Sequence, residues 1–520
     1  MENALEILKK NRTRLITLAI LAFLFFTAVQ GMETSDWAIT VMRGLAVGAI
    51  TFLVAAGLSL IFGLMDVLNL AHGEMFMIGA YVGWTVFVRP DTFVGLLTPL
   101  ALIGIGFVLI PVWTVLLARL SLPQRVARVW PWVGLAAGAA VLIFTLGRYP
   151  ISKWNPEVYS QSPMTFSLAA SQGRAVVPDP VTFEALSPLL VLVALLVGGM
   201  ILALAIVGVG RQTAVSNQAR INRLPLIAAG ILLLVALLAF WFNQPLVEFL
   251  YAISSTWRFA LAMAVAALSG VLLGAVIETT MIRPLYDRPL YQLMLTLGLS
   301  FIGIEMVRYI WGRPEFTMPR PEIFNGSGPN CPATSIGDLI AYQCSTISFF
   351  DGRLRTYNEL FIILIGLIVL IGVWVLLQKT RLGMIIRAGV QDREMVEALG
   401  INVRQVFTLV FALGVGLAAL GGVLAAPSIG LSSDMGTRLL LSALIAMAIG
   451  GLTSYPGAAA GAVLVGLMQQ FIIRYGQIGI TLPFLAEPFK PSPPLVPAST
   501  ILLMVIILLV LPNGLFGRNE

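Results

Sequence analysis

Apolar runs of about 20 residues recur along the whole 520-residue chain. A helix needs roughly 20 apolar residues to cross the hydrocarbon core of a bilayer, so runs of this length predict a polytopic membrane protein. The composition agrees, because 58% of the residues are hydrophobic and only 11% are charged. The predicted fold is all-α, with about 12 to 14 transmembrane segments.

The connectors between the runs carry charges that indicate their side of the membrane. Those beginning at Arg119 and Arg211 are basic and contain no acid, so the positive-inside rule places them in the cytoplasm. A basic flank precedes the first run without a clear cleavage site after it, which predicts an uncleaved first helix and a cytoplasmic N-terminus. The predicted spans are 15–29, 41–63, 75–87, 93–117, 131–146, 189–209, 225–242, 259–282, 292–311, 360–377, 406–426, 439–452, 458–475 and 498–511.

This path leaves both termini in the cytoplasm and the stretches 150–187, 312–358 and 476–497 outside. The short runs 131–146, 439–452 and 498–511 are also compatible with re-entrant segments.

Thr380–Gln405 is unusually charged for this chain and lies between two long apolar runs. Asp392 is a good helix N-cap, and Gly400 suits the left-handed position just after a helix. Between them Met395, Val396 and Leu399 form a small apolar face. The pattern predicts a short amphipathic helix at the ends of membrane helices, with the flanks as connectors. A solvated loop is the alternative.

A second polar stretch interrupts the apolar sequence after residue 63. Asn69, His72 and Glu74 lie in it, and ionisable groups in such surroundings tend to face a cavity or one another. Gly63 and Gly73 would permit a break in the helix, and broken helices are tolerated where they line a cavity. These three residues are candidates for the translocation path. The alternative is a turn in which His72 has a structural hydrogen bond.

The two cysteines, Cys331 and Cys344, both lie in 312–358. A disulfide is plausible there if that stretch faces an oxidising compartment, although two free thiols remain possible. With two cysteines and one histidine, a four-ligand metal site would need carboxylates, so we expect no metal. The net charge of +7 is explained by membrane topology and does not indicate nucleic acid.

The sequence also lacks the chemistry of an enzyme. A P-loop needs Gly-Lys followed by Ser or Thr, and none of the lysines follows a glycine. No nucleophile lies beside the single His72, so we predict no catalytic residues. Because acidic residues are scarce in the predicted spans, the residues favour a pore-forming subunit that another polypeptide energises.

Five motifs follow one another along the chain. They are 69–74 with the following Gly-Ala-Tyr, Arg-Pro-Leu at 283–285 with Thr-Leu-Gly-Leu-Ser, the charged stretch 380–403, Gly-Gly-Leu-Thr-Ser-Tyr-Pro-Gly-Ala at 450–458, and the ending Pro-Asn-Gly-Leu-Phe-Gly. In this order they resemble the branched-chain amino acid permease family of ABC importers. The resemblance covers roughly residues 38–90 and 258–520, and the Asn-Leu-Ala-His-Gly-Glu motif is similar to the first of the family's two paralogous permeases.

The resemblance implies a multi-pass subunit of the bacterial plasma membrane with no cofactor of its own. Its partners would be a second, paralogous permease, two ATP-binding cassette subunits that bind the ATP, an extracytoplasmic substrate-binding protein and membrane lipid. The stretch 380–405 would then be the coupling loop that contacts an ATPase. Its candidate residues are Arg387, Asp392, Arg393, Glu394, Glu397 and Gly400.

The chain departs from the family pattern after residue 87, where four apolar segments are inserted. An even number of spans preserves the orientation of the helices that follow. We therefore divide the chain into N-terminal helices (1–87), an insertion (88–257) and the core permease helices (258–520).

The predicted substrate is a branched-chain or related hydrophobic amino acid. Related permeases carry urea or short amides, and the sequence does not separate these substrates. An ion-coupled secondary transporter is the alternative of a different class.

Overall fold

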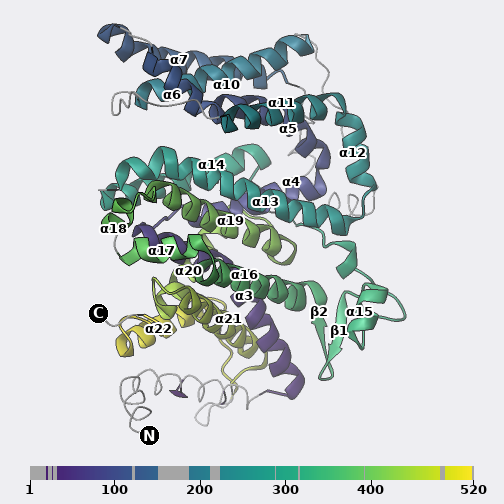
Figure 1. Ribbon diagram of the computed structural model, residues 1–520. Helices are drawn as coiled ribbons and strands as arrows, with labels where there is room; N and C mark the ends of the chain where they lie inside the picture. The colour runs from purple at the N-terminus through teal and green to yellow at the C-terminus, as the bar shows by residue number, and fades with distance from the viewer. Residues whose placement is uncertain are drawn as a thin grey trace. The chain divides into compact units, whose positions relative to one another are not determined.

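The computed structural model describes residues 19–20, 26, 32–119, 123–149, 187–210, 223–286, 288–313, 315, 317–391, 393–480 and 487–517 (Figure 1). Most of the predicted span 15–29 and of the stretch 150–187 lies outside these residues. The chain forms two compact units. The first contains the described residues up to Phe87 and those from Ser255 onward, and the second contains the described residues from Val88 to Ser254.

The first unit is a helical bundle around the long helix α3. Its helices are α3 (Thr34–Met65), α4 (His72–Val88), α13 (Ser255–Ile277), α14 (Pro289–Trp311), α16 (Ile362–Lys379), α17 (Arg381–Gln391), α18 (Arg393–Ala398), α19 (Val403–Ile429), α20 (Met435–Gly450), α21 (Tyr455–Ile478) and α22 (Leu495–Val510).

Helix α3 packs chiefly on α21 and α19 through small residues. A Cβ on Gly44 would lie 2.9 Å from the Cα of Leu467, and a Cβ on Gly57 would lie 2.4 Å from the carbonyl oxygen of Gly414. Small residues allow this approach where lipid gives helices no hydrophobic reason to associate. The glycine spacing of the sequence therefore places α3 in the middle of the bundle.

The second unit contains α5 (Pro90–Val108), α6 (Ile110–Arg119), α7 (Gln124–Leu146), α10 (Pro188–Gly210), α11 (Leu224–Trp241) and α12 (Asn243–Ala252). Helix α10 packs on α5 and α7, and a Cβ on Gly106 would lie 2.3 Å from the carbonyl oxygen of Gly199. The predicted span 93–117 is divided between α5 and α6.

The polar stretch between α14 and α16 folds into a small cap. It contains two single turns, η4 (Glu322–Phe324) and the π-helical η5 (Thr356–Phe361), the helix α15 (Ile336–Tyr342), and the antiparallel strands β1 (Thr346–Phe349) and β2 (Gly352–Arg355). The hairpin and α15 lie at one end of α16, and α17 lies at its other end (Figure 1).

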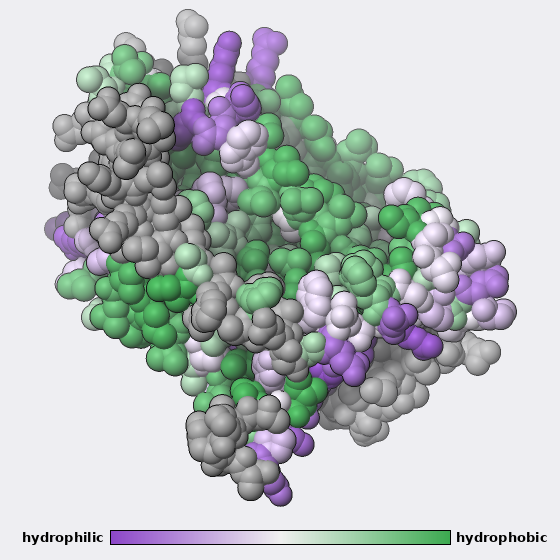
Figure 2. Space-filling model, turned by 90° about the horizontal axis from the view of Figure 1, so that it is seen from below, coloured by the Kyte–Doolittle hydropathy of each residue, from purple (hydrophilic) through white to green (hydrophobic). Residues whose placement is uncertain are grey.

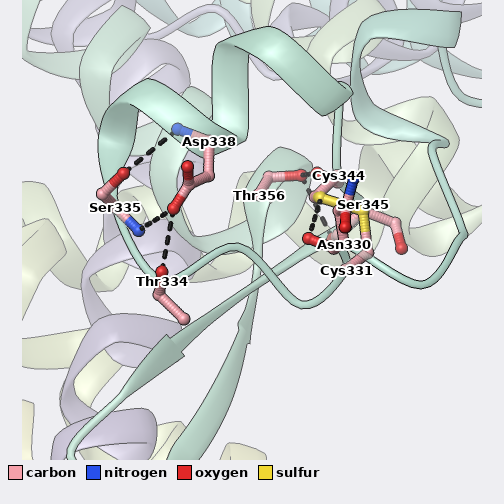
Figure 3. The surroundings of a disulfide bond; sticks show 8 residues. All are labelled: Asn330, Cys331, Thr334, Ser335, Asp338, Cys344, Ser345 and Thr356. Atoms are coloured by element: carbon pink, nitrogen blue, oxygen red, sulfur yellow. Dashed lines mark hydrogen bonds between the residues drawn. A yellow bond between two sulfur atoms is a disulfide. The ribbon is translucent and has the colours of Figure 1, made fainter.

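A disulfide closes this cap. Cys331 and Cys344 are bonded, with their Cα atoms 5.5 Å apart, and Cys344 follows the end of α15 (Figure 3). The hydroxyl of Ser335 accepts a hydrogen bond from the backbone N–H of Asp338, whose carboxylate accepts from the N–H of Ser335 in return. This capping box explains why the short helix begins at Ile336.

The all-α membrane fold is confirmed. Within the described ranges, ten helices are long and apolar enough to cross a membrane, and α6, α20 and α22 are shorter apolar helices. On the face in Figure 2, apolar residues form a broad area and hydrophilic side chains gather toward its edges. Such a surface is expected where side chains meet lipid.

Candidate functional site

The helix break predicted near residue 70 lies between α3 and α4, at residues 66–71. Asp66 ends α3 with a left-handed φ of 52°, a conformation that Asp tolerates better than most residues. The side chain of Asn69 then accepts a hydrogen bond from the N–H of Ala71 at 3.1 Å, which turns the chain into α4.

The predicted role of the two glycines in this break is wrong. Gly63 lies inside α3 and Gly73 lies inside α4. Gly73 instead permits a close approach, because a Cβ there would lie 2.4 Å from the carbonyl oxygen of Gly436. The first turns of α4 and α20 therefore touch inside the bundle.

Glu74 lies where these two helix starts meet, and its side chain is completely buried. Its Oε1 atom accepts hydrogen bonds from the hydroxyls of Ser300 in α14 and Thr437 in α20, each at 3.0 Å. Among the described residues, its Oε2 atom has no hydrogen-bond partner. Helix N-termini favour negative charge, so the positive ends of α4 and α20 help to hold this carboxyl group in the bundle.

His72 and Asn69 are also buried, with 0% and 1% of their surface exposed. His72 lies elsewhere, at the crossing of α3 and α19. A Cβ added to Gly57 would lie 2.8 Å from the Nε2 atom of His72. The Nδ2 atom of Asn69 has no hydrogen-bond partner in the described part of the chain. The three predicted path residues therefore do not share one contact: Glu74 faces α14 and α20, whereas His72 lies at the crossing of α3 and α19.

The charged stretch forms two helices, α17 and α18, and its N-terminal flank is not the expected connector. Gly400 has the predicted positive φ, at 80°. The apolar face divides, since Val396 is 3% exposed whereas Met395 and Leu399 are 60% and 73% exposed. Asp392 and the side chains of Arg393 and Glu394 lie outside the described residues.

A hydrophobic cluster connects these helices to the end of α3. Leu64, Ile386 of α17 and Val396 of α18 are buried members of this cluster. The Cδ1 atom of Leu64 would lie 3.5 Å from a Cβ on Gly389. Leu64 is two residues before the break at Asp66, so the cluster shared by α17 and α18 includes the part of α3 that leads to this break.

Sequence reasoning missed a polar network beside this cluster. Glu278 is fully buried at the start of a π-helical turn, η2 (Glu278–Ile282), which the 3₁₀ turn η3 (Arg283–Leu285) follows. Its carboxylate accepts from Arg283 at 3.0 Å, from Thr408 of α19 at 2.6 Å and from the hydroxyl of Tyr286. The signal was the Arg-Pro-Leu motif, because its arginine follows a glutamate by five residues.

Arg387 and Glu397 occupy different positions in the charged stretch. Arg387 lies on α17, where its guanidinium donates to the side-chain oxygen of Gln378 at the end of α16. Glu397 is exposed on α18, between Val396 and the helix end. The exposed apolar and charged side chains of α18 thus form the outer surface of the stretch. Within the described residues, no group of three or more His, Cys, Asp or Glu could hold a metal.

Three curated proteins illustrate what the chain is similar to. It is 30% identical to the high-affinity branched-chain amino acid transport system permease protein BraD of Pseudomonas aeruginosa, over 33% of this chain and 52% of BraD. The corresponding protein LivH of Escherichia coli is 24% identical over 47% of this chain and 70% of LivH. The fructose import permease protein FruF of Bifidobacterium longum is 32% identical over 25% of this chain and 38% of FruF.

The match to BraD therefore spans about half of that protein's length. No solved structure matches the chain. The family model described as branched-chain amino acid transport system / permease component matches residues 219–511, which is more than half of the chain. The chain belongs to this family of membrane permeases.

Proposed function

We propose that the chain is a membrane-spanning permease subunit of an ATP-driven importer of branched-chain amino acids. One observation carries this proposal: Ile386 of α17 and Val396 of α18 share one buried cluster with Leu64 of α3, next to the buried polar break. A force applied to these two helices would reach the break through contiguous packed side chains.

The exposed surface of α18 is suited to contact an ATPase subunit. Met395 and Leu399 are large apolar side chains that stay exposed. Together with Glu397 they provide the apolar and charged groups that a protein partner can cover. The partners would be two ATP-binding cassette subunits, a second permease and an extracytoplasmic binding protein, with α17, α18 and both termini in the cytoplasm.

The break would form part of the substrate path. Helix ends inside a membrane bundle can hold polar groups of a solute, and the first turns of α4 and α20 meet at Glu74. The Glu74 Oε2 and Asn69 Nδ2 atoms have hydrogen-bonding capacity that a passing amino acid could use.

Reconstitution tests the class of transporter. Proteoliposomes that contain the permeases, the ATPases and the binding protein should accumulate leucine only when ATP is supplied. If the binding protein bound urea and not leucine, the proposed substrate would be urea. Accumulation by liposomes that hold this chain alone, without ATP, would exclude the ATP-driven importer.

A charge reversal tests the coupling surface. Glu397→Lys should abolish substrate-stimulated ATP hydrolysis while membrane insertion stays normal, since it places a cation in the proposed contact. The matched control is Glu487→Lys, an exposed glutamate in the stretch before α22. Normal ATP hydrolysis in Glu397→Lys would contradict a docking role for α18.

The buried carboxyl group supports a second candidate function. Acidic groups inside membrane bundles commonly carry protons in ion-coupled transporters. Glu74 is such a group, with one oxygen atom that has no partner among the described residues. An ion-coupled carrier would require uptake driven by a pH gradient, which the liposomes with this chain alone would reveal.

A further inference from the structure

A cavity of about 550 Å³ lies beside α17, and no described residue of α18 is among those that line it. Its walls come from the last turns of α3, the junction of α16 and α17, and the start of α21. Ser59, Leu64, Met384, Arg387, Thr453 and Ser454 are among the residues that line it.

The cavity combines apolar walls with a single kind of charge. Leu64 and Met384 contribute hydrocarbon surface, and Arg387 is the cation. None of the described lining residues is acidic. Arginine binds carboxylates by paired, charge-assisted hydrogen bonds, so this cavity is complementary to an anion with an apolar body.

Two further features fix the anionic end of such a ligand. The hydrogen bond from Arg387 to Gln378, also a lining residue, holds the guanidinium at the cavity wall. Helix α21 begins at Tyr455, with Ser454 as its N-cap, so the positive end of a 24-residue helix lies at the same cavity. Ser59 donates to the carbonyl oxygen of Leu452 at 3.4 Å, which ties α3 to the turn before α21.

We propose that this cavity binds a small aliphatic carboxylate that lacks an ammonium group, such as a branched-chain 2-oxo acid. An amino acid would bring an ammonium group beside the Arg387 guanidinium, where like charges repel and no acidic residue is present among the described lining residues. The removal of the amino group from an imported branched-chain amino acid yields a carboxylate of this class.

Occupancy would inhibit transport. A ligand between Arg387 and Ser59 joins α17 to the last turns of α3, and so opposes movement of α17 relative to the break. The consequence for transport rests on the proposed function, whereas binding to the cavity does not. The metabolic product of the imported solute would then restrain further import.

Thiol labelling of the full-length permease tests the binding. Met384→Cys places a thiol at an exposed position in the cavity wall, and the native cysteines are bonded to each other. 4-Methyl-2-oxopentanoate should slow labelling of this thiol in a saturable way. The neutral alcohol 4-methylpentanol, which has the same branched chain, should not.

Two further variants decide whether the cavity is the site. Arg387→Gln should weaken the protection on the order of tenfold or more, through loss of a charge-assisted bond. Arg381→Gln, an exposed arginine on the same helix that does not line the cavity, should leave it unchanged. Gly63→Val, which fills the cavity from α3, should abolish the protection even if Arg387→Gln fails to fold.

Equal protection in Arg387→Gln and the parent protein would overturn the proposal. So would protection that depends on phosphatidylglycerol in the surrounding bilayer and not on the oxo acid, because the cavity would then hold a lipid headgroup. Failure of leucine import by the complete transporter, with protection intact, would refute the proposed function and leave this site standing.

Discussion

Arg283 and Glu278 form an ion pair at the point where α13 gives way to a single π-helical turn. Thr408 of α19 donates to the same carboxylate, and Arg283 also donates to Thr408 at 2.6 Å. The π turn thus directs the Glu278 side chain between α13 and α19. This network lies next to the cluster beneath α17 and α18, since Tyr286 belongs to both.

Glu278→Ala should destabilise the permease on the order of 2 kcal/mol, because it leaves Arg283, Thr408 and Tyr286 without their shared acceptor. Thermal unfolding in detergent measures the effect. Glu305→Ala is the control, since Glu305 pairs with Arg308 at the surface and is 63% exposed. Surface pairs contribute about 0 to 1 kcal/mol, so similar losses in both variants would contradict a structural role for the buried network.

Gly73→Ala should prevent normal assembly of the bundle. The added methyl group would meet the backbone of Gly436 at 2.4 Å, where neither helix has a flexible side chain to move. We expect a large fall in the yield of folded protein by size-exclusion chromatography. Gly298→Ala in α14, with nothing within 4 Å of its added methyl group, should be neutral. A normal yield of folded Gly73→Ala would show that α4 and α20 leave room for a methyl group, in contradiction to this close approach.

Glu74→Gln should keep the fold and lower leucine import by on the order of tenfold, if the carboxylate contributes a charged hydrogen bond to the solute. Glutamine retains an oxygen that can accept from Ser300 and Thr437. Initial rates of labelled leucine uptake in the complete transporter measure the change. Wild-type uptake would assign Glu74 to the fold alone.

Cys331→Ser should loosen the cap between α14 and α16. Its disulfide closes a loop of sequence separation 13, and loops of that size are stabilised by about 3 kcal/mol in the chain-entropy model. Limited proteolysis should therefore cleave the cap faster in the variant, and in the parent protein after reduction. Identical cleavage rates would show that other contacts hold the cap.

The capping box of α15 should make the cap sensitive to acid. Hydrogen bonds from Ser335 and Thr334 lower the pKa of Asp338 below its usual value. The ionised Asp338 carboxylate therefore stabilises α15 fully above the pKa of an unfolded aspartate, about 4. This stabilisation is lost as pH falls through the lower pKa of the folded state. Amide exchange of α15, corrected for intrinsic rates, should rise below that point in the parent protein and be pH-independent in Asp338→Asn.

Apolar run length predicted most of the membrane helices, because a helix in lipid must satisfy its own backbone groups and needs a fixed length. The length of an apolar run does not indicate which helices contact one another. Run length could not show that Gly73 allows α4 to approach α20 closely. Nor could it show that α3 ends at Asp66 and not at a glycine. A glycine is compatible with both roles, and only the partner helix decides between them.

The charged stretch shows a second limit. The pattern around Gly400 predicted the end of α18, since a left-handed residue there has a local cause. It did not predict that Val396 would turn inward while Met395 and Leu399 stay exposed. Val396 is buried in a cluster whose other members include Leu64, more than 300 positions earlier in the chain, and the periodicity of one segment carries no information about such a partner.

The two ends of the first unit that flank the second unit lie side by side. The rings of Phe87, near the end of α4, and Phe259, near the start of α13, are 5.7 Å apart and pack edge to face. Joining neighbouring ends requires only a short linker, whose closure entropy is small. Residues 88–254 are therefore open to deletion by protein engineering, and a chain reduced in this way would resemble a minimal permease that kept α3, Glu74 and α18.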